Sequence, residues 1–285
     1  VIGFSVGVQF QSANAYRRDW QLQKNLFWQM AWRMPKLKPG TTLLFNDLPI
    51  QFASDNSLTA PFNWIYAPAN RTERMDYMVY VTSIRMGLGL PGLQPGLPIR
   101  QDYLAATFEG DSSQVVALHY QPPGCLRVLD ADLDPLNKML PVLSRQAAAL
   151  SRVDLIQPAS SQEAVRPPQH IFGGEPQPDW CYYQAHAELA RQLGDWQAVA
   201  ALGDQAFKLN DYPNDPAERL VFIEGYARTG NWERARQLSD QTHQITPLMQ
   251  PVLCRLWERI QAAQPGDAQT NSIIQETRSE LDCRD

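Results

Sequence analysis

The residues able to do chemistry in this chain of 285 residues form no recognisable catalytic or metal-binding motif. The four histidines stand outside any H-E-x-x-H or H-x-H setting, and no G-x-S-x-G elbow, P-loop or kinase signature occurs. His119 lies in an alternating, strand-like run, which favours a structural role. The sequence therefore predicts no catalytic residue, no metal ligand and no cofactor.

Carboxylates are the next candidates for chemistry. Asp130, Asp132 and Asp134 alternate as in a cation-binding loop, but the glycine and the distant glutamate of a calcium hand are missing. This spacing favours a solvated turn. Asp47 and Asp102 flank predicted strands and could form a carboxylate pair, although spacing alone does not bring them together.

One stretch matches a nucleotide-binding motif literally. Gly87-Leu-Gly89-Leu-Pro-Gly92 has the G-x-G-x-x-G spacing and follows a predicted strand. A dinucleotide site needs this motif to open a helix, whose N-terminal amides face the pyrophosphate. The prolines and glycines that follow exclude such a helix, so we predict a mobile loop.

The four cysteines, at positions 125, 181, 254 and 283, include no C-x-x-C pair, so zinc or iron–sulfur ligation is disfavoured. Four cysteines permit disulfides in an oxidising compartment but form no dense disulfide framework. We interpret them as free or buried thiols. Cys181 and Cys254 are expected about 20 Å apart, on helices two repeat layers away from each other, beyond bridging distance.

Charge is unevenly distributed along the chain. The 25 basic and 30 acidic residues give a net charge of −5, which argues against a nucleic-acid partner. Residues 1–170 carry a net charge of +2, and residues 171–285 carry −7. The second part is therefore expected to favour a basic partner.

The charge step coincides with a stretch rich in proline and glycine. It contains the pair Gly173-Gly174 and several prolines: Pro158, Pro167, Pro168, Pro176 and Pro178. Proline favours extended backbone and glycine frees it, so we predict an interdomain linker. The predicted organisation is a mixed α/β domain over 1–156, this linker over 157–178, helical repeats over 179–264 and a polar tail over 265–285.

Elements of the first domain follow from local patterns. A helix over 13–34 is indicated by apolar residues at helical spacing and is ended by Pro35. Further helices are expected over 58–66 and 135–150, and strands over 41–45, 77–84, 104–108, 115–120 and 125–129. The last two strands flank Gln121-Pro-Pro-Gly124, which is typical of a hairpin turn. This order predicts an α+β or α/β unit with a small mixed sheet.

The opening segment admits two interpretations. Residues 1–8 are apolar but too few to span a bilayer, so they either end a membrane helix or form a buried strand. Trp28 and Trp32 lie off the apolar stripe of the helix that follows. They suit a membrane–water interface, or they pack on the sheet.

The second part contains an internal repeat. Residues 183–211 and 219–247 align at a constant offset of 36. The aligned pairs that we expect to pack the repeats are Gly194 with Gly230, Trp196 with Trp232, and Leu202 with Leu238. Each glycine would end a first helix, and each tryptophan would begin the second. Repetition of this length predicts stacked helical hairpins.

Capping signals support the same architecture. Asp215-Pro216 and Thr246-Pro247 each place a side-chain acceptor before a proline, as at helix starts, and Glu218 stands at a capping-box position. A third pair is expected to begin with a helix over 252–263, ended by Pro265-Gly266. The pattern of glycine, aromatic, alanine and closing proline resembles the tetratricopeptide repeat in degenerate form.

The whole chain resembles the non-membrane C-terminal region of multi-pass bacterial envelope proteins, some of them associated with lipid-linked-sugar glycosyltransferases. The segments that carry this resemblance are Trp20–Pro35, Pro122–Asp130, Trp180–Phe207, Phe222–Ala235 and Leu253–Ile260. In such glycosyltransferases the catalytic carboxylate lies in loops between membrane helices. The resemblance therefore assigns no catalytic residue to this chain.

These features lead to one functional hypothesis and one alternative. The first is a non-catalytic, membrane-tethered protein-interaction module whose helical repeats bind a protein or peptide, with the tether preceding Val1. The alternative is an accessory domain that binds glycan or lipid-linked sugar for a membrane glycosyltransferase. A deep pocket lined by tryptophan and carboxylates would favour the sugar. The resemblance implies the outer face of the bacterial inner membrane, whereas Arg17-Arg18 near a membrane end would favour the cytoplasm.

Overall fold

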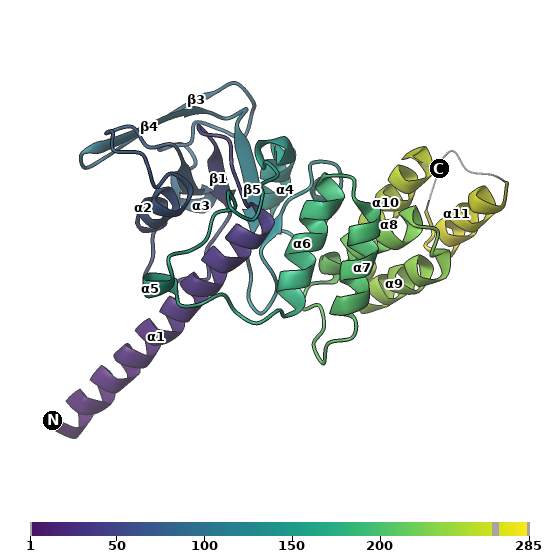
Figure 1. Ribbon diagram of the computed structural model, residues 1–285, viewed down its shortest axis with the longest axis horizontal. Helices are drawn as coiled ribbons and strands as arrows, with labels where there is room; N and C mark the ends of the chain where they lie inside the picture. Colours follow the sequence, from purple (N-terminus) through teal and green to yellow (C-terminus); the bar gives the residue numbers. More distant parts are fainter. Residues whose placement is uncertain (1, 264–267, 284–285) are drawn as a thin grey trace.

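The computed structural model describes residues 2–263 and 268–283. Figure 1 shows a unit with a small sheet, a row of helices beside it and one long helix that projects from the body. The predicted fold class is confirmed at this level: an α+β unit is followed by a helical region. The predicted helix end at Pro265-Gly266 lies outside the described residues.

The projecting element is helix α1, Ile2–Arg33, which begins eleven residues earlier than the start predicted at position 13. The alternative of a buried strand for the opening segment is wrong, because the described residues of that segment are helical and exposed. The last third of α1 is buried in the body, as at Leu26, Phe27 and Met30. No helix within residues 2–263 and 268–283 is long and apolar enough to cross a membrane.

The sheet has the strand order β2-β1-β5-β6, in which β1 is parallel to β2 and β5, and β6 is antiparallel to β5. Alternate residues of β1 enter different cores. Leu43 and Phe45 pack toward α1, whereas Leu44 packs on the opposite face. Because both faces are covered, β1, β2 and β5 are mostly apolar. The bounds of the four strands are β1 Thr42–Phe45, β2 Met78–Val81, β5 Val115–His119 and β6 Arg127–Val128.

Several boundaries differ from the predictions for local reasons. Helix α2, Asp55–Tyr66, begins three residues early because Ser54 and Ser57 form a capping box. The strand predicted over 77–84 ends at Val81, and helix α3, Thr82–Arg85, follows it. The helix predicted over 135–150 is divided into a 3₁₀ turn, η1 Asp134–Leu136, and α4, Val142–Ala148, and Pro141 stands at the start of α4.

A two-stranded hairpin stands beside the main sheet. Strand β3, Pro98–Tyr103, pairs with β4, Ala106–Asp111. The prediction of a strand over 104–108 is wrong at its start, because Leu104 lies in the tight turn with a φ of 53°. Strand β3 was not predicted, since its proline and charged residues give no apolar alternation.

The proline-rich stretch over 157–178 lies against the end of α1. The amide of Gln157 donates to the carbonyl of Lys36 at 2.8 Å, and the amide of Val165 donates to Pro35 at 2.9 Å. Phe172, in the short helix α5 Gln169–Phe172, is buried with its ring 4.9 Å from that of Phe27. This stretch is therefore anchored along its length rather than detached from the body.

The helical region consists of three consecutive hairpins, α6/α7, α8/α9 and α10/α11. The first helices contact one another, α6 with α8 and α8 with α10. Residues expected to form a polar tail instead form α11, in which Ile274 and Thr277 are fully buried. The helices are α6 Trp180–Gln192, α7 Trp196–Ala206, α8 Leu220–Arg228, α9 Trp232–Ile245, α10 Gln250–Ala263 and α11 Ala268–Glu280.

Candidate functional site

The six residues expected to pack the repeats lie in the first two hairpins, α6/α7 and α8/α9. Gly194 and Gly230 follow α6 and α8 with φ angles of 75° and 83°, a left-handed conformation that favours glycine. Trp196 and Trp232 are the first residues of α7 and α9. Leu238 is fully buried, and its counterpart Leu202 is half-buried at the edge of the same core.

The two tryptophan rings have different partners, both on a first helix. The guanidinium of Arg228 stands 4.7 Å from the centre of the Trp196 ring, and the rings of Trp232 and Trp257 are 6.5 Å apart. Arg228 lies on α8 and Trp257 on α10, so each tryptophan contacts the first helix of the following hairpin. The predicted helix caps are also present, because Asp215 accepts from the amide of Ala217 and Thr246 accepts from that of Leu248.

The acidic turn, residues 130–134, is not the solvated turn that spacing favoured. Asp130 Oδ2 accepts from Arg191 on α6 at 2.9 Å and from Arg259 on α10 at 2.8 Å. Burial alone would raise the pKa of Asp130, but the two arginines hold it well below its usual range. The turn therefore binds the helical hairpins of the same chain through ion pairs.

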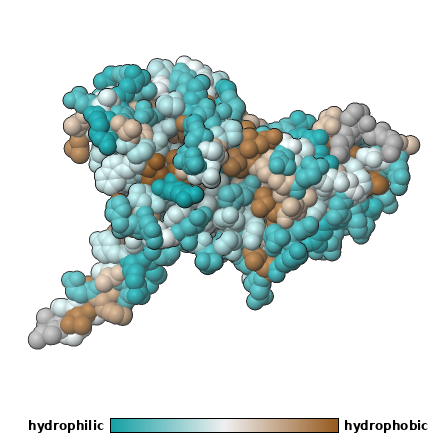
Figure 2. Space-filling model, viewed as in Figure 1, coloured by the Kyte–Doolittle hydropathy of each residue, from teal (hydrophilic) through white to brown (hydrophobic). Residues whose placement is uncertain are grey.

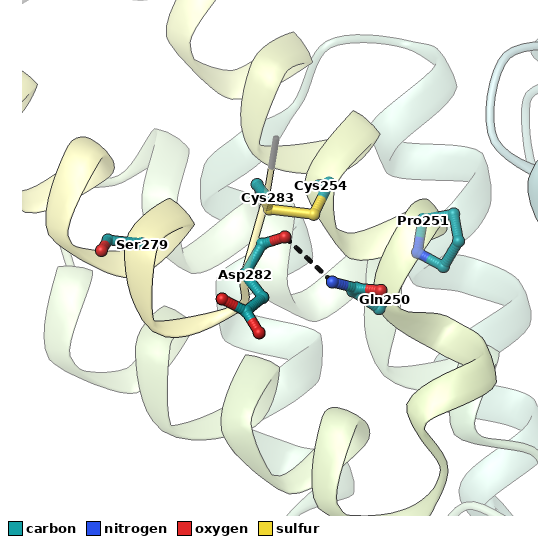
Figure 3. Close-up of a pocket in the computed structure, with 6 residues that line it drawn as sticks. All are labelled: Gln250, Pro251, Cys254, Ser279, Asp282 and Cys283. Carbon is teal, nitrogen blue, oxygen red and sulfur yellow. Dashed lines mark hydrogen bonds between the residues drawn. A yellow bond between two sulfur atoms is a disulfide. The ribbon is translucent and has the colours of Figure 1, made fainter. Parts of the chain in front are cut away.

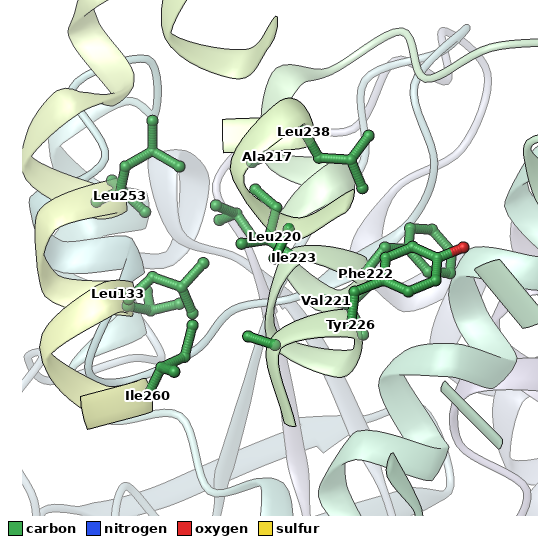
Figure 4. Close-up of a cluster of buried hydrophobic side chains, with 14 of the residues drawn as sticks. Leu133, Ala217, Leu220, Val221, Phe222, Ile223, Tyr226, Leu238, Leu253 and Ile260 are labelled. Carbon is green, nitrogen blue, oxygen red and sulfur yellow. The ribbon is translucent and has the colours of Figure 1, made fainter. Parts of the chain in front are cut away.

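Further ion pairs link α8 to α10 and the turn to α10. Glu224 of α8 accepts from Arg259 at 2.7 Å, and Asp132 accepts from Arg255 of α10 at 2.7 Å. Leu133, at the centre of the turn, belongs to the hydrophobic core of the hairpins, and Figure 4 shows it beside Leu253 and Ile260. Part of the face formed by the first helices is thus covered by the chain's own acidic turn.

A buried ion pair fixes the base of the same turn. Arg127 donates to Asp134 at 2.7 Å and lies 3.3 Å from Asp215, and both Arg127 and Asp134 are almost inaccessible. Burial alone would lower the pKa of Arg127, but the two carboxylates raise it above its usual value. Sequence reasoning missed this network. The only signal was an arginine three residues before three alternating aspartates, which does not reveal the arginines on distant helices.

A cavity of about 480 Å³ lies where the sheet unit meets the connection between α7 and α8. Its eleven lining residues include His119, Asn214 and Asp215, and the others are Gln121, Pro122, Pro123, Gly124, Cys125, Met139, Leu140 and Pro141. Burial, followed by the charge of Arg127, lowers the pKa of His119, so the imidazole is neutral at pH 7. His119 and Asp215 are the titratable side chains of this lining.

Glu218 lies buried behind this cavity. Its carboxylate accepts from the amide of Cys125 at 2.7 Å and from that of Asn214 at 3.2 Å, so it joins the two units instead of closing the expected capping box. Burial raises the pKa of Glu218 to about 7. The result is a titratable hydrogen-bond acceptor inside the joint, which is the contact between the sheet unit and the helical hairpins.

The interpretation of the cysteines as thiols is wrong, because all four form disulfides. Cys125 pairs with Cys181 and ties the hairpin after β5 to α6, and Cys254 pairs with Cys283. Figure 3 shows the second bond beside the hydrogen bond from Gln250 to the carbonyl of Asp282. Cys181 and Cys254 do not pair with each other, as expected. Spacing did not reveal the true partners, because the first pair joins different units.

The remaining candidates do not form a common site. Asp47 accepts from Ser83 at 2.6 Å, whereas Asp102 accepts from Thr107 at 2.9 Å within the β3–β4 hairpin. The segment over 87–92 forms turns and opens no helix, as predicted. The depression beside Trp64, an exposed residue, has no carboxylate in its lining. Within the described ranges, no cluster of three or more His, Cys, Asp or Glu side chains is arranged to hold a metal ion.

Comparison with known proteins adds no identity: no family model, no curated protein and no solved structure matches this chain.

Proposed function

We propose that this chain is a non-catalytic, membrane-tethered interaction module, the non-membrane region of a larger bacterial membrane protein. The observation that carries the proposal is the first part of α1, which projects from the body and exposes large apolar side chains. Phe4 is 79% exposed and Phe10 is 69% exposed. Figure 2 shows hydrophobic surface on the projecting helix. Apolar side chains gathered on a protruding helix indicate a membrane or protein contact.

The helical region supports an interaction role of the tetratricopeptide-like kind. The second helices α7 and α9 begin at Trp196 and Trp232, which are 36 residues apart. Stacked helical repeats have a constant period of this kind. We therefore infer that the first two hairpins are copies of the repeat found in the sequence.

The partner, on this proposal, binds the edge where successive hairpins are joined. Part of the first-helix face is covered by the acidic turn, whereas the connections between hairpins expose Tyr212 at 70%, Ile245 at 54% and Leu248 at 49%. Asp179 and Asp211 lie exposed at the same end. Apolar anchors beside carboxylates fit a partner with basic and hydrophobic side chains.

An extracytoplasmic location fits the two disulfides. Disulfide bonds persist in oxidising compartments and are rare in the bacterial cytoplasm. Both bonds tie elements that are otherwise far apart in sequence, Cys125 with Cys181 and Cys254 with Cys283. We propose that the module lies on the outer face of the inner membrane.

The proposal is tested by photocrosslinking in native membranes. A benzophenone amino acid replaces Tyr212 in the full-length protein, and the matched control carries it at Leu193, which is 50% exposed at the opposite end of the hairpins. We expect a discrete protein adduct from position 212 and none from position 193. Equal labelling from both positions, or none from either, would contradict binding at this edge.

A further inference from the structure

A shallow groove separates α1 from the turn that follows β1. Its volume is about 610 Å³. Apolar rings line it at Phe10 and Phe52, and a cation lines it at Arg18. The remaining lining is polar or small: Gln11, Ser12, Asn14, Ala15 and Gln51. The groove thus joins an apolar surface to a positive charge and hydrogen-bonding amides.

A buried carboxylate fixes the turn that forms one side of the groove. Asp19 is 5% exposed, and its two oxygens accept from the amides of Gln51 at 2.6 Å and Phe52 at 3.1 Å. The rings of Tyr16 and Phe52 stack with centroids 4.0 Å apart. The turn is therefore fixed against α1, and Phe52 keeps 42% of its surface exposed beside the helix.

The chemistry along α1 changes in a fixed order. Phe4, Val6 and Phe10 are exposed and apolar, whereas Arg17 and Arg18 are exposed and cationic. At 1.5 Å per residue, Phe4 and Arg18 lie about 20 Å apart along the helix axis. One leaflet of hydrocarbon is about 15 Å thick. When the first turns lie in hydrocarbon, the arginines reach the headgroups.

The two arginines carry charge that the described part of the chain does not neutralise. No carboxylate of the described residues forms an ion pair with Arg17 or Arg18. The adjacent Asp19 is turned into the body and occupied by backbone amides. A cationic level next to exposed aromatic rings is complementary to an anionic phospholipid surface.

We propose that this groove binds an anionic phospholipid, with the phosphate at Arg18 and an acyl chain along Phe10 and Phe52. The body of the protein then rests on the membrane surface at the level of residues 10–18 of α1. This inference rests on the proposed membrane tether. It adds a lipid-binding site and the level of α1 at which the membrane surface lies.

Fluorescence of labelled single-cysteine variants tests the site. The four native cysteines are in disulfides, so Phe52→Cys, Phe4→Cys and Trp64→Cys each offer one thiol for an environment-sensitive NBD probe. Each labelled full chain is mixed with vesicles of phosphatidylcholine, alone or in equal parts with phosphatidylglycerol. Trp64, 65% exposed and outside the groove, is the matched control. Circular dichroism before mixing confirms that each variant is folded.

We expect blue-shifted, stronger emission from positions 4 and 52 on the anionic vesicles and no change at position 64. Arg18→Ser should weaken binding to these vesicles about fivefold, since one cation near an anionic surface contributes about 1 kcal/mol. A response at position 4 without one at position 52 leaves the tether intact and overturns the lipid site. No response at either position overturns the tether as well. Equal responses on both vesicle types exclude the anionic headgroup.

Discussion

The joint and the projecting part of α1 are unusual in opposite ways: the joint buries charged side chains, and α1 exposes apolar ones. At the joint, charged side chains such as Asp130 and Arg191 are largely removed from water. On α1, large apolar side chains such as Phe4 and Phe10 are exposed to it. For Asp130 and Arg191 the chain supplies its own compensation, because each of them meets an opposite charge. On α1 the described residues do not cover these apolar side chains, which indicates a contact with another molecule.

The largest expected effect comes from breaking the compensation at the joint. Asp130→Ala removes one hydrogen bond from Arg191 and one from Arg259, and leaves Glu188 and Glu224 as their remaining partners. We expect the free energy of unfolding to fall by about 3–5 kcal/mol, because two charge-assisted hydrogen bonds are lost from a poorly solvated site. Urea denaturation measures the change.

A matched control is the exposed pair Arg152–Asp154, in which both side chains are more than half exposed. Asp154→Ala should change the stability by less than about 1 kcal/mol. Similar losses for both variants would mean that the joint network is no more important than a surface pair.

A second test removes the covalent link across the joint. Cys125→Ser with Cys181→Ser opens a bridge between residues 56 apart, so we expect a loss of about 2–4 kcal/mol. Removing Cys254–Cys283, which are 29 apart, should cost about half a kcal/mol less on loop length alone. Thermal unfolding of the two double variants, side by side, gives the order. The reverse order would show that strain or local packing outweighs loop length.

The pH dependence of stability tests the acceptor at the joint. The pKa of Glu218 is about 7 in the folded protein, above the value of 4.5 usual for glutamate. The folded state therefore binds more protons than the unfolded state between these values, and the contribution of this group to stability falls as the pH rises from about 4.5 to 7. The loss should amount to roughly 2–3 kcal/mol.

Glu218→Gln should remove this part of the pH dependence, as measured by unfolding at pH 5 and pH 8. Asp130 has the opposite sign, because its lowered pKa adds stability that is lost under acid. A wild-type profile that is flat from pH 5 to pH 8 would contradict the assignment for Glu218.

Substitutions in the exposed part of α1 are expected to have the smallest effect on stability. Phe4→Ser with Phe10→Ser removes side chains that are 79% and 69% exposed, so the free energy of unfolding should change by less than about 0.5 kcal/mol. Flotation with phospholipid vesicles should nevertheless decrease strongly, since the apolar contact is lost. A large loss of stability would show that these side chains already contact the body.

Sequence reasoning worked best where the physical cause is local. The hairpins followed from glycines at helix ends and from side-chain caps such as Thr246 before a proline. The buried strands followed from continuous apolar runs. Boundaries were less accurate where a nearby side chain intervened, as at Ser54, whose capping box starts α2 early. The acidic turn was misread because its compensating arginines lie on α6 and α10, more than 60 residues away.

By itself, the sequence determined where helices end, which strands are apolar and how charge is distributed. Helix ends and apolar strands depend on residues that are close in the chain, and the distribution of charge depends on composition alone. The tertiary structure decided which charges are buried together, which cysteines pair and which apolar side chains stay exposed. These outcomes depend on contacts between distant segments. A solvated turn and a turn that binds another part of the chain can share one local sequence, and only the opposing surface distinguishes them.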